Sequence, residues 1–262
     1  MATIVFVHAH PDDEASTTSG SMARAAAEGH RVVLVVCTNG EHGEVPEDLA
    51  PGETLVDRRR DEVSRSAAVL GVARVEWLGY QDSGMTGWAQ NDDGGSFWRA
   101  DPDEAAGRLA AILGEERADV VVVYDWHGGY GHPDHIQVHR VGHRAADLAG
   151  TPKRFEVTYN RDLVVQMMSE DATRREDFDP NGPSDDGNPF GTAEADLHLA
   201  VDVSDYTALK RQALTSHASQ VTDIGMFLGM PEAVFDRFFG TEYYLEPGAP
   251  PGLRAGWLLE GV

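Results

Sequence analysis

The feature that most constrains the fold is the alternation of short β-branched runs with helix-like segments over the first 160 residues. The expected strands are residues 3–7, 32–37, 74–77, 120–124 and 155–158, and the expected helices between them are residues 21–28, 56–70, 102–116 and 133–149. Strands that alternate with helices in this way form a parallel sheet covered by helices on both faces. The sequence therefore predicts an α/β fold with a doubly wound, mostly parallel, Rossmann-like sheet.

The chain divides into a core and a C-terminal elaboration. Residues 1–170 carry the alternating pattern and are expected to form a Rossmann-like core. Residues 171–193 are rich in turn formers and poor in apolar periodicity, which predicts a long loop. The rest of residues 171–262 is expected to pack on the sheet as an elaboration, so that the whole chain forms a single structural domain.

Charge and cysteine content narrow the partners and the compartment. The 44 acidic against 21 basic side chains give a formal net charge of -23. Such a surface repels phosphate backbones and anionic lipid, so neither nucleic acid nor a membrane is an expected partner. With one cysteine, Cys37, no signal-peptide pattern and no long apolar run, the expected compartment is the cytoplasm. Whether the chain forms a homo-oligomer stays an open question.

The first motif that carries chemistry follows the first expected strand, where ligands bind in a doubly wound sheet. The segment from His8 to Glu14 reads His-Ala-His-Pro-Asp-Asp-Glu and lacks the glycines of a dinucleotide-binding loop. It instead places His10, Asp12 and Asp13 together beside a proline. Imidazoles and carboxylates are ligands that suit zinc or another divalent metal.

The second motif follows the fourth expected strand. Three glycines surround Tyr130, and His132-Pro-Asp134-His135 then opens a helix. His132 and His135 repeat the three-residue spacing of His10 and Asp13, and the two strand ends belong to one edge of the sheet. The two pairs could therefore converge on one ion with three protein ligands and a water, the composition of a catalytic zinc site.

Further histidines compete for the metal. His135, His139 and His143 fall on one face of the same expected helix. Three ligands on a straight helix span about 12 Å, which is too far for one ion, so at most two of them could share a site. Surface or packing roles are favoured for His139 and His143.

The paired motifs resemble the PIG-L/LmbE family of zinc-dependent de-N-acetylases, which includes the GlcNAc-phosphatidylinositol deacetylase and the actinobacterial mycothiol enzymes. The resemblance runs from Ile4 to about Ala149, with weaker similarity to Gln220. Its other segments are Thr38-Asn39-Gly40-Glu41, Arg59-Arg60-Asp61-Glu62, Leu70-Gly71-Val72, Asp82-Ser83-Gly84-Met85 and Ser216-His217-Ala218-Ser219-Gln220.

The resemblance also implies roles for individual residues. It makes His10, Asp13 and His135 the ligands of one Zn²⁺ per chain, with other divalent metals such as Fe²⁺ left open. It makes Asp12 the general base, His132 the group that polarises the carbonyl or protonates the leaving amine, Asp134 its carboxylate partner and Tyr130 a mobile tyrosine over the substrate. By the same resemblance Arg59 orients the substrate, with the register among Arg58, Arg59 and Arg60 open, and Asp82 contacts a substrate hydroxyl.

The residue types support a hydrolytic mechanism. Zinc lowers the pKa of a bound water to about 7, and Asp12 is free to accept its proton because the side chains of neighbouring residues diverge. A cationic His132, with its pKa raised by Asp134, would then protonate the amine, a role typically worth about 10²–10⁴-fold. The expected function is removal of an N-acetyl or related N-acyl group from a small molecule that contains an amino sugar.

Three alternatives stay beside this function. The first is an amidase of the mycothiol-S-conjugate type, which would act on a thiol conjugate. The second is a relative that binds metal or sugar without catalysis, although Asp12 and His132 would then have no purpose. The third, a signalling receiver, also carries an acidic pair after its first strand, but it needs an aspartate after the third strand, where Trp77-Leu78-Gly79 stands here.

Overall fold

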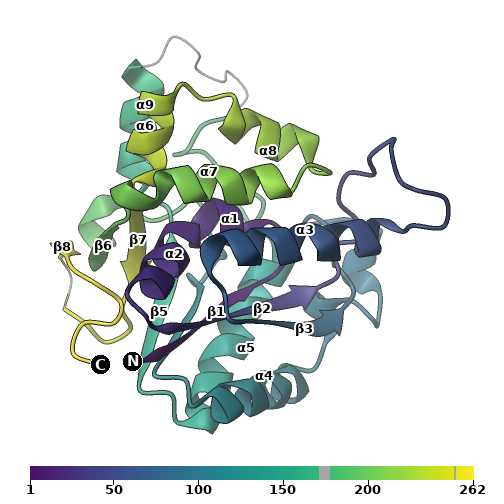
Figure 1. Cartoon of the computed structure of the whole chain (residues 1–262), viewed down its shortest axis with the longest axis horizontal. Helices are drawn as coiled ribbons and strands as arrows, with labels where there is room; N and C mark the ends of the chain where they lie inside the picture. The colour runs from purple at the N-terminus through teal and green to yellow at the C-terminus, as the bar shows by residue number, and fades with distance from the viewer. Residues whose placement is uncertain (171–177, 251) are drawn as a thin grey trace.

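The protein is built around one central sheet, seen in a computed structural model that describes residues 1–170, 178–250 and 252–262 (Figure 1). Within these residues the sheet has eight strands in the order β3-β2-β1-β4-β5-β7-β6-β8. The strands are β1 (Thr3–His8), β2 (Arg31–Thr38), β3 (Arg74–Tyr80), β4 (Val120–Tyr124), β5 (Lys153–Thr158), β6 (Leu199–Asp202), β7 (Thr241–Leu245) and β8 (Arg254–Ala255).

The first five strands pair in parallel, as the alternating pattern predicts. Ile4 of β1 is in register with Val32 of β2 on one side and with Val120 of β4 on the other. The chain therefore leaves β1 at the point where the strand order reverses, which is where doubly wound sheets bind ligands. The predicted α/β fold class is confirmed.

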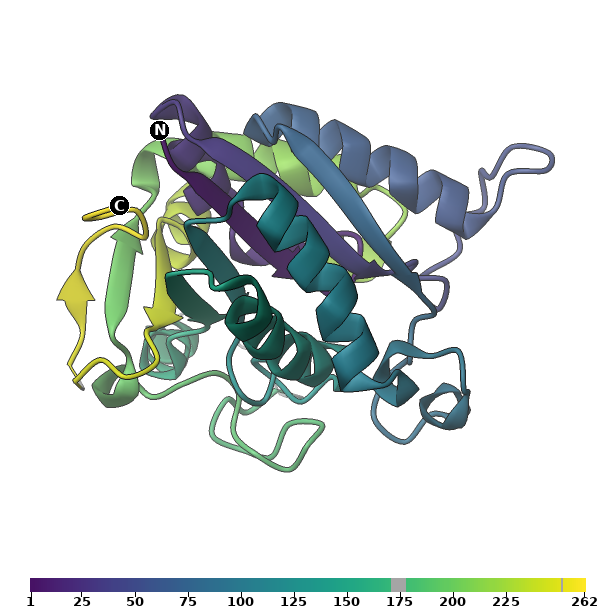
Figure 2. The same cartoon turned by 90° about the horizontal axis from the view of Figure 1, so that it is seen from below.

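Helices cover both faces of the sheet (Figures 1 and 2). Helices α1, α2, α3 and α7 lie on one face, and α4 and α5 lie together on the other. The helices are α1 (Asp13–Thr17), α2 (Ser19–Ala27), α3 (Leu55–Leu70), α4 (Pro102–Glu116), α5 (Pro133–Ala149), α6 (Arg161–Glu170), α7 (Thr207–Ser216), α8 (Val221–Leu228) and α9 (Glu232–Phe239). The predicted bounds of α4 and α5 match because Asp101 and His132 cap their first turns with side-chain acceptors.

Two helical predictions differ from the structure. The expected helix at 21–28 begins earlier, as α1 and α2, which are separated at Thr18, whose hydroxyl lies 2.7 Å from Nε2 of the buried His8. Helix α6 was not predicted, because its β-branched pair Val164-Val165 weakens the helical pattern. The signal that could have found it is Asn160, whose side chain accepts a hydrogen bond from the backbone of Leu163 at 3.1 Å.

The C-terminal part extends the sheet instead of only packing on it. Strand β7 pairs antiparallel with both β5 and β6, so residues far along the chain continue the sheet started by the first five strands. The buried Lys210 of α7 pairs with Glu242 of β7 at 2.9 Å, and Glu242 also accepts hydrogen bonds from the first turn of α2. Part of the predicted loop, residues 171–177, lies outside the described residues; residues 178–193 have neither helix nor strand.

The core lies between the sheet and its helices. Phe6, Leu34 and Val122 on adjacent strands are fully or almost fully buried. Cys37 is buried beside them, and burial raises the pKa of its thiol, as expected for an inert side chain. In the part of the chain that the structure describes, no helix is long and apolar enough to cross a membrane.

Helix α5 approaches the sheet closely at Gly142. A Cβ at this position would lie 2.3 Å from Cγ1 of Val123, whereas a Cβ at Gly107 of α4 would meet nothing within 4 Å. We expect Gly142→Ala to lower the free energy of unfolding by about 1–3 kcal/mol through overpacking. The matched control Gly107→Ala should raise it by about 0.5–1 kcal/mol. Urea unfolding of both variants measures the difference, and equal effects would contradict this packing.

Candidate functional site

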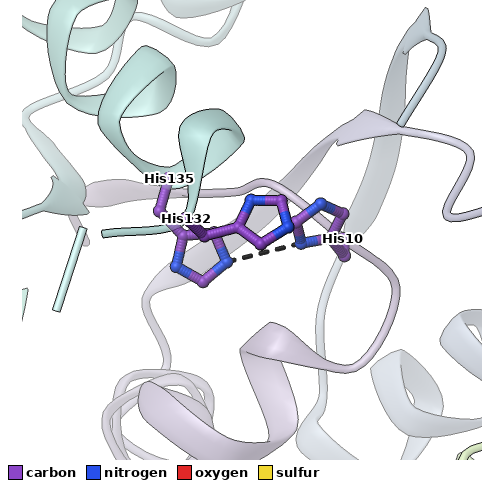
Figure 3. A group of neighbouring side chains, drawn as sticks. All are labelled: His10, His132 and His135. Atoms are coloured by element: carbon purple, nitrogen blue, oxygen red, sulfur yellow. Dashed lines mark hydrogen bonds between the residues drawn. The ribbon is translucent and has the colours of Figure 1, made fainter. Parts of the chain in front are cut away.

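The two sequence motifs meet at one edge of the sheet. The first occupies the turn between β1 and α1, and the second runs from the end of β4 into α5. Because β1 and β4 are neighbours, both turns emerge side by side. His10 from the first turn faces His132 and His135 from the start of α5 (Figure 3).

Three side-chain atoms form a nearly equilateral triangle. Nδ1 of His10 lies 3.3 Å from Oδ2 of Asp13, Oδ2 of Asp13 lies 3.4 Å from Nε2 of His135, and Nε2 of His135 lies 3.3 Å from Nδ1 of His10. Ligands about 2.0–2.1 Å from a tetrahedral zinc ion are about 3.3–3.4 Å apart. The spacing of these three atoms therefore fits a divalent metal without rearrangement.

Hydrogen bonds behind both histidine rings turn the other nitrogen of each ring toward the centre of the triangle, where the two nitrogens face each other at 3.3 Å. Nδ1 of His135 lies 3.1 Å from the carbonyl oxygen of Gly128, which can only accept, so Nδ1 carries the proton and Nε2 keeps its lone pair. Nε2 of His10 donates to the carboxylate of Asp134 at 3.2 Å, which turns Nδ1 toward Asp13 and His135. Burial opposes a charge on His10, but Asp82, Asp13 and Asp134 more than offset it and raise the pKa of His10, so a bound cation would take the place of the Nδ1 proton. Such acceptors behind histidine ligands orient the rings and raise their basicity.

The charge of the cluster also favours a cation. Asp13, Asp82 and Asp134 are all nearly buried around His10. Burial opposes ionisation of Asp13, but His135 and His10 more than offset it and hold the pKa of Asp13 well below its usual range. Carboxylates that stay ionised in a buried site need a counter-charge, which a divalent cation supplies.

Asp134 differs from the sequence expectation, whereas the contact of Asp82 with a substrate hydroxyl stays a prediction. Asp134 was expected to be the carboxylate partner of His132, but its carboxylate contacts His10 and accepts hydrogen bonds from the backbone and hydroxyl of Ser83. Its backbone amide, not its carboxylate, bonds to Nδ1 of His132, at 3.1 Å. Asp82 lies at the same centre, with Oδ1 3.6 Å from Nε2 of His10.

The surroundings of His132 favour a neutral imidazole, whereas the sequence predicts a cation. Burial is the largest cause, and His10 and His135 add to it, so the pKa of His132 lies well below its usual value. Because Nδ1 accepts the amide hydrogen of Asp134, the neutral ring carries its proton on Nε2. His132 can therefore donate a hydrogen bond to a developing oxyanion without being charged.

Asp12 lies at the turn between β1 and α1 in an unusual backbone conformation, with φ of 117°. Its amide donates to Oε2 of Glu14 at 3.1 Å, and its carboxylate accepts from the Arg59 guanidinium at 2.9 Å. Burial raises the pKa of Asp12 to about 6, although Arg59 opposes the shift. A carboxylate with such a pKa is suited to accept a proton near neutral pH.

The structure resolves the register of the three arginines. Arg59 is 3% exposed and holds the carbonyl oxygens of Gly40 and Pro11 as well as Asp12. Arg58 pairs with Asp48 and Glu53 near the surface, and Arg60 bonds to Asn39. Among the three arginines, Arg59 is thus the one that contacts Asp12, and its predicted role of orienting the substrate stays a prediction.

Tyr130 lies in a loop with three glycines in left-handed conformation, at φ of 68°, 78° and 93° for Gly128, Gly129 and Gly131. The Tyr130 ring lies 5.1 Å from that of His135. A Cβ at Gly128 would lie 2.3 Å from Cβ of His135, so only glycine fits this approach. The backbone amides of Asp185 and Gly191 donate hydrogen bonds to the carbonyl oxygens of Tyr130 and Gly129 in this loop.

Two supporting groups were not predicted. Tyr124 at the end of β4 stacks on His135, with ring centroids 4.2 Å apart and planes 4° apart. Glu14, which supports Asp12, is itself held by the buried His217 at 2.7 Å and by Ser66 at 2.6 Å. The segment Ser216–Gln220 is one of those that resemble the PIG-L/LmbE family, and this resemblance is the sequence signal that could have identified His217 as a residue near the site.

Comparison with known proteins agrees with this geometry. The family model described as "PIG-L: GlcNAc-PI de-N-acetylase" matches residues 5–146, which include both motifs. The chain belongs to the PIG-L family. One PIG-L relative, the 1D-myo-inositol 2-acetamido-2-deoxy-alpha-D-glucopyranoside deacetylase of Streptomyces avermitilis, is 40% identical over 99% of this chain and 97% of its own length.

A second relative and a solved structure are also similar to this chain. The protein of that name from Thermobifida fusca is 41% identical over 92% of this chain and 91% of its own length. Among solved structures, the N,N'-diacetylchitobiose deacetylase of Pyrococcus horikoshii has a TM-score of 0.59 at 23% identity and covers 93% of this chain and 83% of that one. That structural likeness supports the shared fold.

Proposed function

We propose that this PIG-L protein is a zinc-dependent deacetylase that removes the N-acetyl group from an amino sugar linked to inositol. The observation that carries the proposal is the triangle of His10 Nδ1, Asp13 Oδ2 and His135 Nε2, with sides of 3.3, 3.4 and 3.3 Å. Two nitrogens and one carboxylate oxygen, with a fourth position left for water or substrate, are the donor set of a catalytic zinc site.

The chain's own residues divide the reaction between them. A bound divalent metal would polarise the acetamide carbonyl and lower the pKa of the attacking water. Asp12, held by Arg59, accepts the proton of that water and can pass it to the amine that leaves. His132 donates from Nε2 to the developing oxyanion, and Tyr130 closes over the opposite side. Acetate and a free amine are the products.

The substrate class comes from the curated relatives. The names of the Streptomyces and Thermobifida proteins specify a deacetylase that acts on 2-acetamido-2-deoxyglucopyranosyl inositol. Both are aligned over at least nine-tenths of this chain, so the residues around the metal ligands and those of the C-terminal part are compared together. We propose the same substrate here.

A panel of amides tests the substrate. Zinc-loaded protein should release free amine from GlcNAc-inositol with a higher kcat/KM than from free GlcNAc. The kcat/KM should also be higher than for a thiol conjugate in which N-acetylcysteine is joined by an amide bond to the deacetylated sugar. The amine is measured by fluorescent labelling. If the thiol conjugate gave the highest kcat/KM, the chain would be an amidase; if no amide were cleaved while zinc was bound, the site would bind without catalysis.

Tyr130 provides a separate prediction about the transition state. If its hydroxyl contacts mainly the developing oxyanion, Tyr130→Phe should lower kcat and kcat/KM together by about 10–10³-fold. The melting temperature should barely change, because the ring stays in place. Steady-state kinetics and thermal melts test this, with Tyr243→Phe of β7 as the matched control. An unchanged kcat would assign Tyr130 to packing.

A further inference from the structure

A second cluster of metal-ligating side chains lies farther along α5. His139 and His143 are one helical turn apart, and Glu156 of the neighbouring strand β5 faces them. One ligand atom from each of the three lies within 4.8 Å of the others. Their side chains are 23%, 22% and 11% exposed, so water and ions can reach them.

The contacts within the cluster suit a metal. Nε2 of His143 donates to Oε1 of Glu156 at 2.8 Å, so an ion bound between them would replace this proton. The two imidazole rings are 4.6 Å apart. Nδ1 of His139 donates to the carbonyl oxygen of Tyr124 at 3.1 Å and lies 3.8 Å from Oε1 of Glu156, so the lone pair that His139 would offer to an ion is the one on Nε2 of the same ring.

This cluster is distinct from the site of His10, Asp13 and His135. The helical rise of about 1.5 Å per residue puts His143 about 12 Å along the axis from His135, beyond the reach of one ion. The two clusters nevertheless share a neighbour. Tyr124 stacks its ring on His135 and gives its carbonyl oxygen to His139.

We infer that His139, His143 and Glu156 form a second site for a divalent transition metal. Two histidines at i and i+4 on one helix face are a known zinc-binding arrangement. A carboxylate from a different element completes a three-ligand set, and water can fill the remaining positions because the cluster is partly exposed. An ion bound there would link α5 directly to β5.

The test is a zinc titration of protein whose first site is already loaded with one equivalent. Isothermal titration calorimetry should show one further equivalent. His143→Ala and Glu156→Gln should each lower the zinc affinity of the second site by more than about 100-fold. Loss of a residue that only contacts a ligand lowers metal affinity by roughly 10–100-fold, so the larger effect identifies a ligand. The first equivalent should stay bound in both variants. His42→Ala, which removes an exposed histidine elsewhere, should leave both events unchanged.

Two further measurements separate this site from the first. In His135→Ala the second event should persist, which makes the result independent of whether the proposed deacetylation is correct. Electron paramagnetic resonance of Cu²⁺ at the second site should show coupling to two imidazole nitrogens in the parent protein and to one in His143→Ala. Binding of a single equivalent by the parent protein would overturn the inference, as would an undiminished second equivalent in both His143→Ala and Glu156→Gln.

Discussion

Replacing Asp12 with asparagine should lower kcat by about 10²–10⁴-fold while zinc stays bound, because the variant loses a general base but no metal ligand. Asparagine keeps the shape of the side chain. Arg59 still has the carbonyl oxygens of Gly40 and Pro11 as partners. Deacetylation kinetics and elemental analysis of the same samples measure both quantities.

The control for Asp12 is another aspartate that pairs with an arginine. Asp48 contacts Arg58 at 3.0 Å, and its side chain is 79% exposed. Asp48→Asn should therefore leave kcat and zinc content unchanged. If Asp12→Asn kept a near-normal kcat, the base would have to be another group, and Glu14 would be the first candidate.

Replacing His135 with alanine should remove the metal together with the activity. The variant loses one corner of the triangle, and with it the 3.1 Å hydrogen bond to Gly128 and the stacking on Tyr124. At a free zinc concentration that fills only the site of His10, Asp13 and His135, we expect zinc content to fall from about one equivalent to nearly none. The free energy of unfolding should fall by about 1–3 kcal/mol, which leaves a cooperative fold.

His132→Ala distinguishes two sets of ligands. His10, His132 and His135 also place one nitrogen each within 4.8 Å of the others, so an all-histidine site competes with the set that contains Asp13. If Asp13 is the ligand, His132→Ala keeps zinc and loses turnover, whereas Asp13→Ala loses both. The surface variant His30→Ala should change neither. Loss of zinc from His132→Ala with retention in Asp13→Ala would reverse the assignment.

Local signals account for what the sequence predicted well. The bounds of α4 and α5 were exact because Asp101 and His132 start these helices with proline at the next position. The convergence of His10 and His135 followed from parallel strands that end at one edge of the sheet. Their assignment as ligands stays a proposal, which their spacing in the structure supports.

Contacts between distant segments account for what was missed. Asp134 is next but one to His132, yet its carboxylate turns toward His10, which lies 124 residues away. Neither spacing nor motif specifies that choice, because it depends on how α5 sits against the turn after β1. The same holds for the support of Glu14 by His217, which is 203 residues distant, and for the insertion of β7 beside β5.

The most direct test of the metal centre is an anomalous difference map, recorded at the zinc absorption edge from crystals of zinc-loaded protein. The geometry predicts a strong peak about 2.0–2.2 Å from Nδ1 of His10, Oδ2 of Asp13 and Nε2 of His135. Asp12 and His132 should lie near the peak without ligating it. A peak ligated by His132 in place of Asp13, or no peak among these residues in crystals that still cleave substrate, would contradict the account.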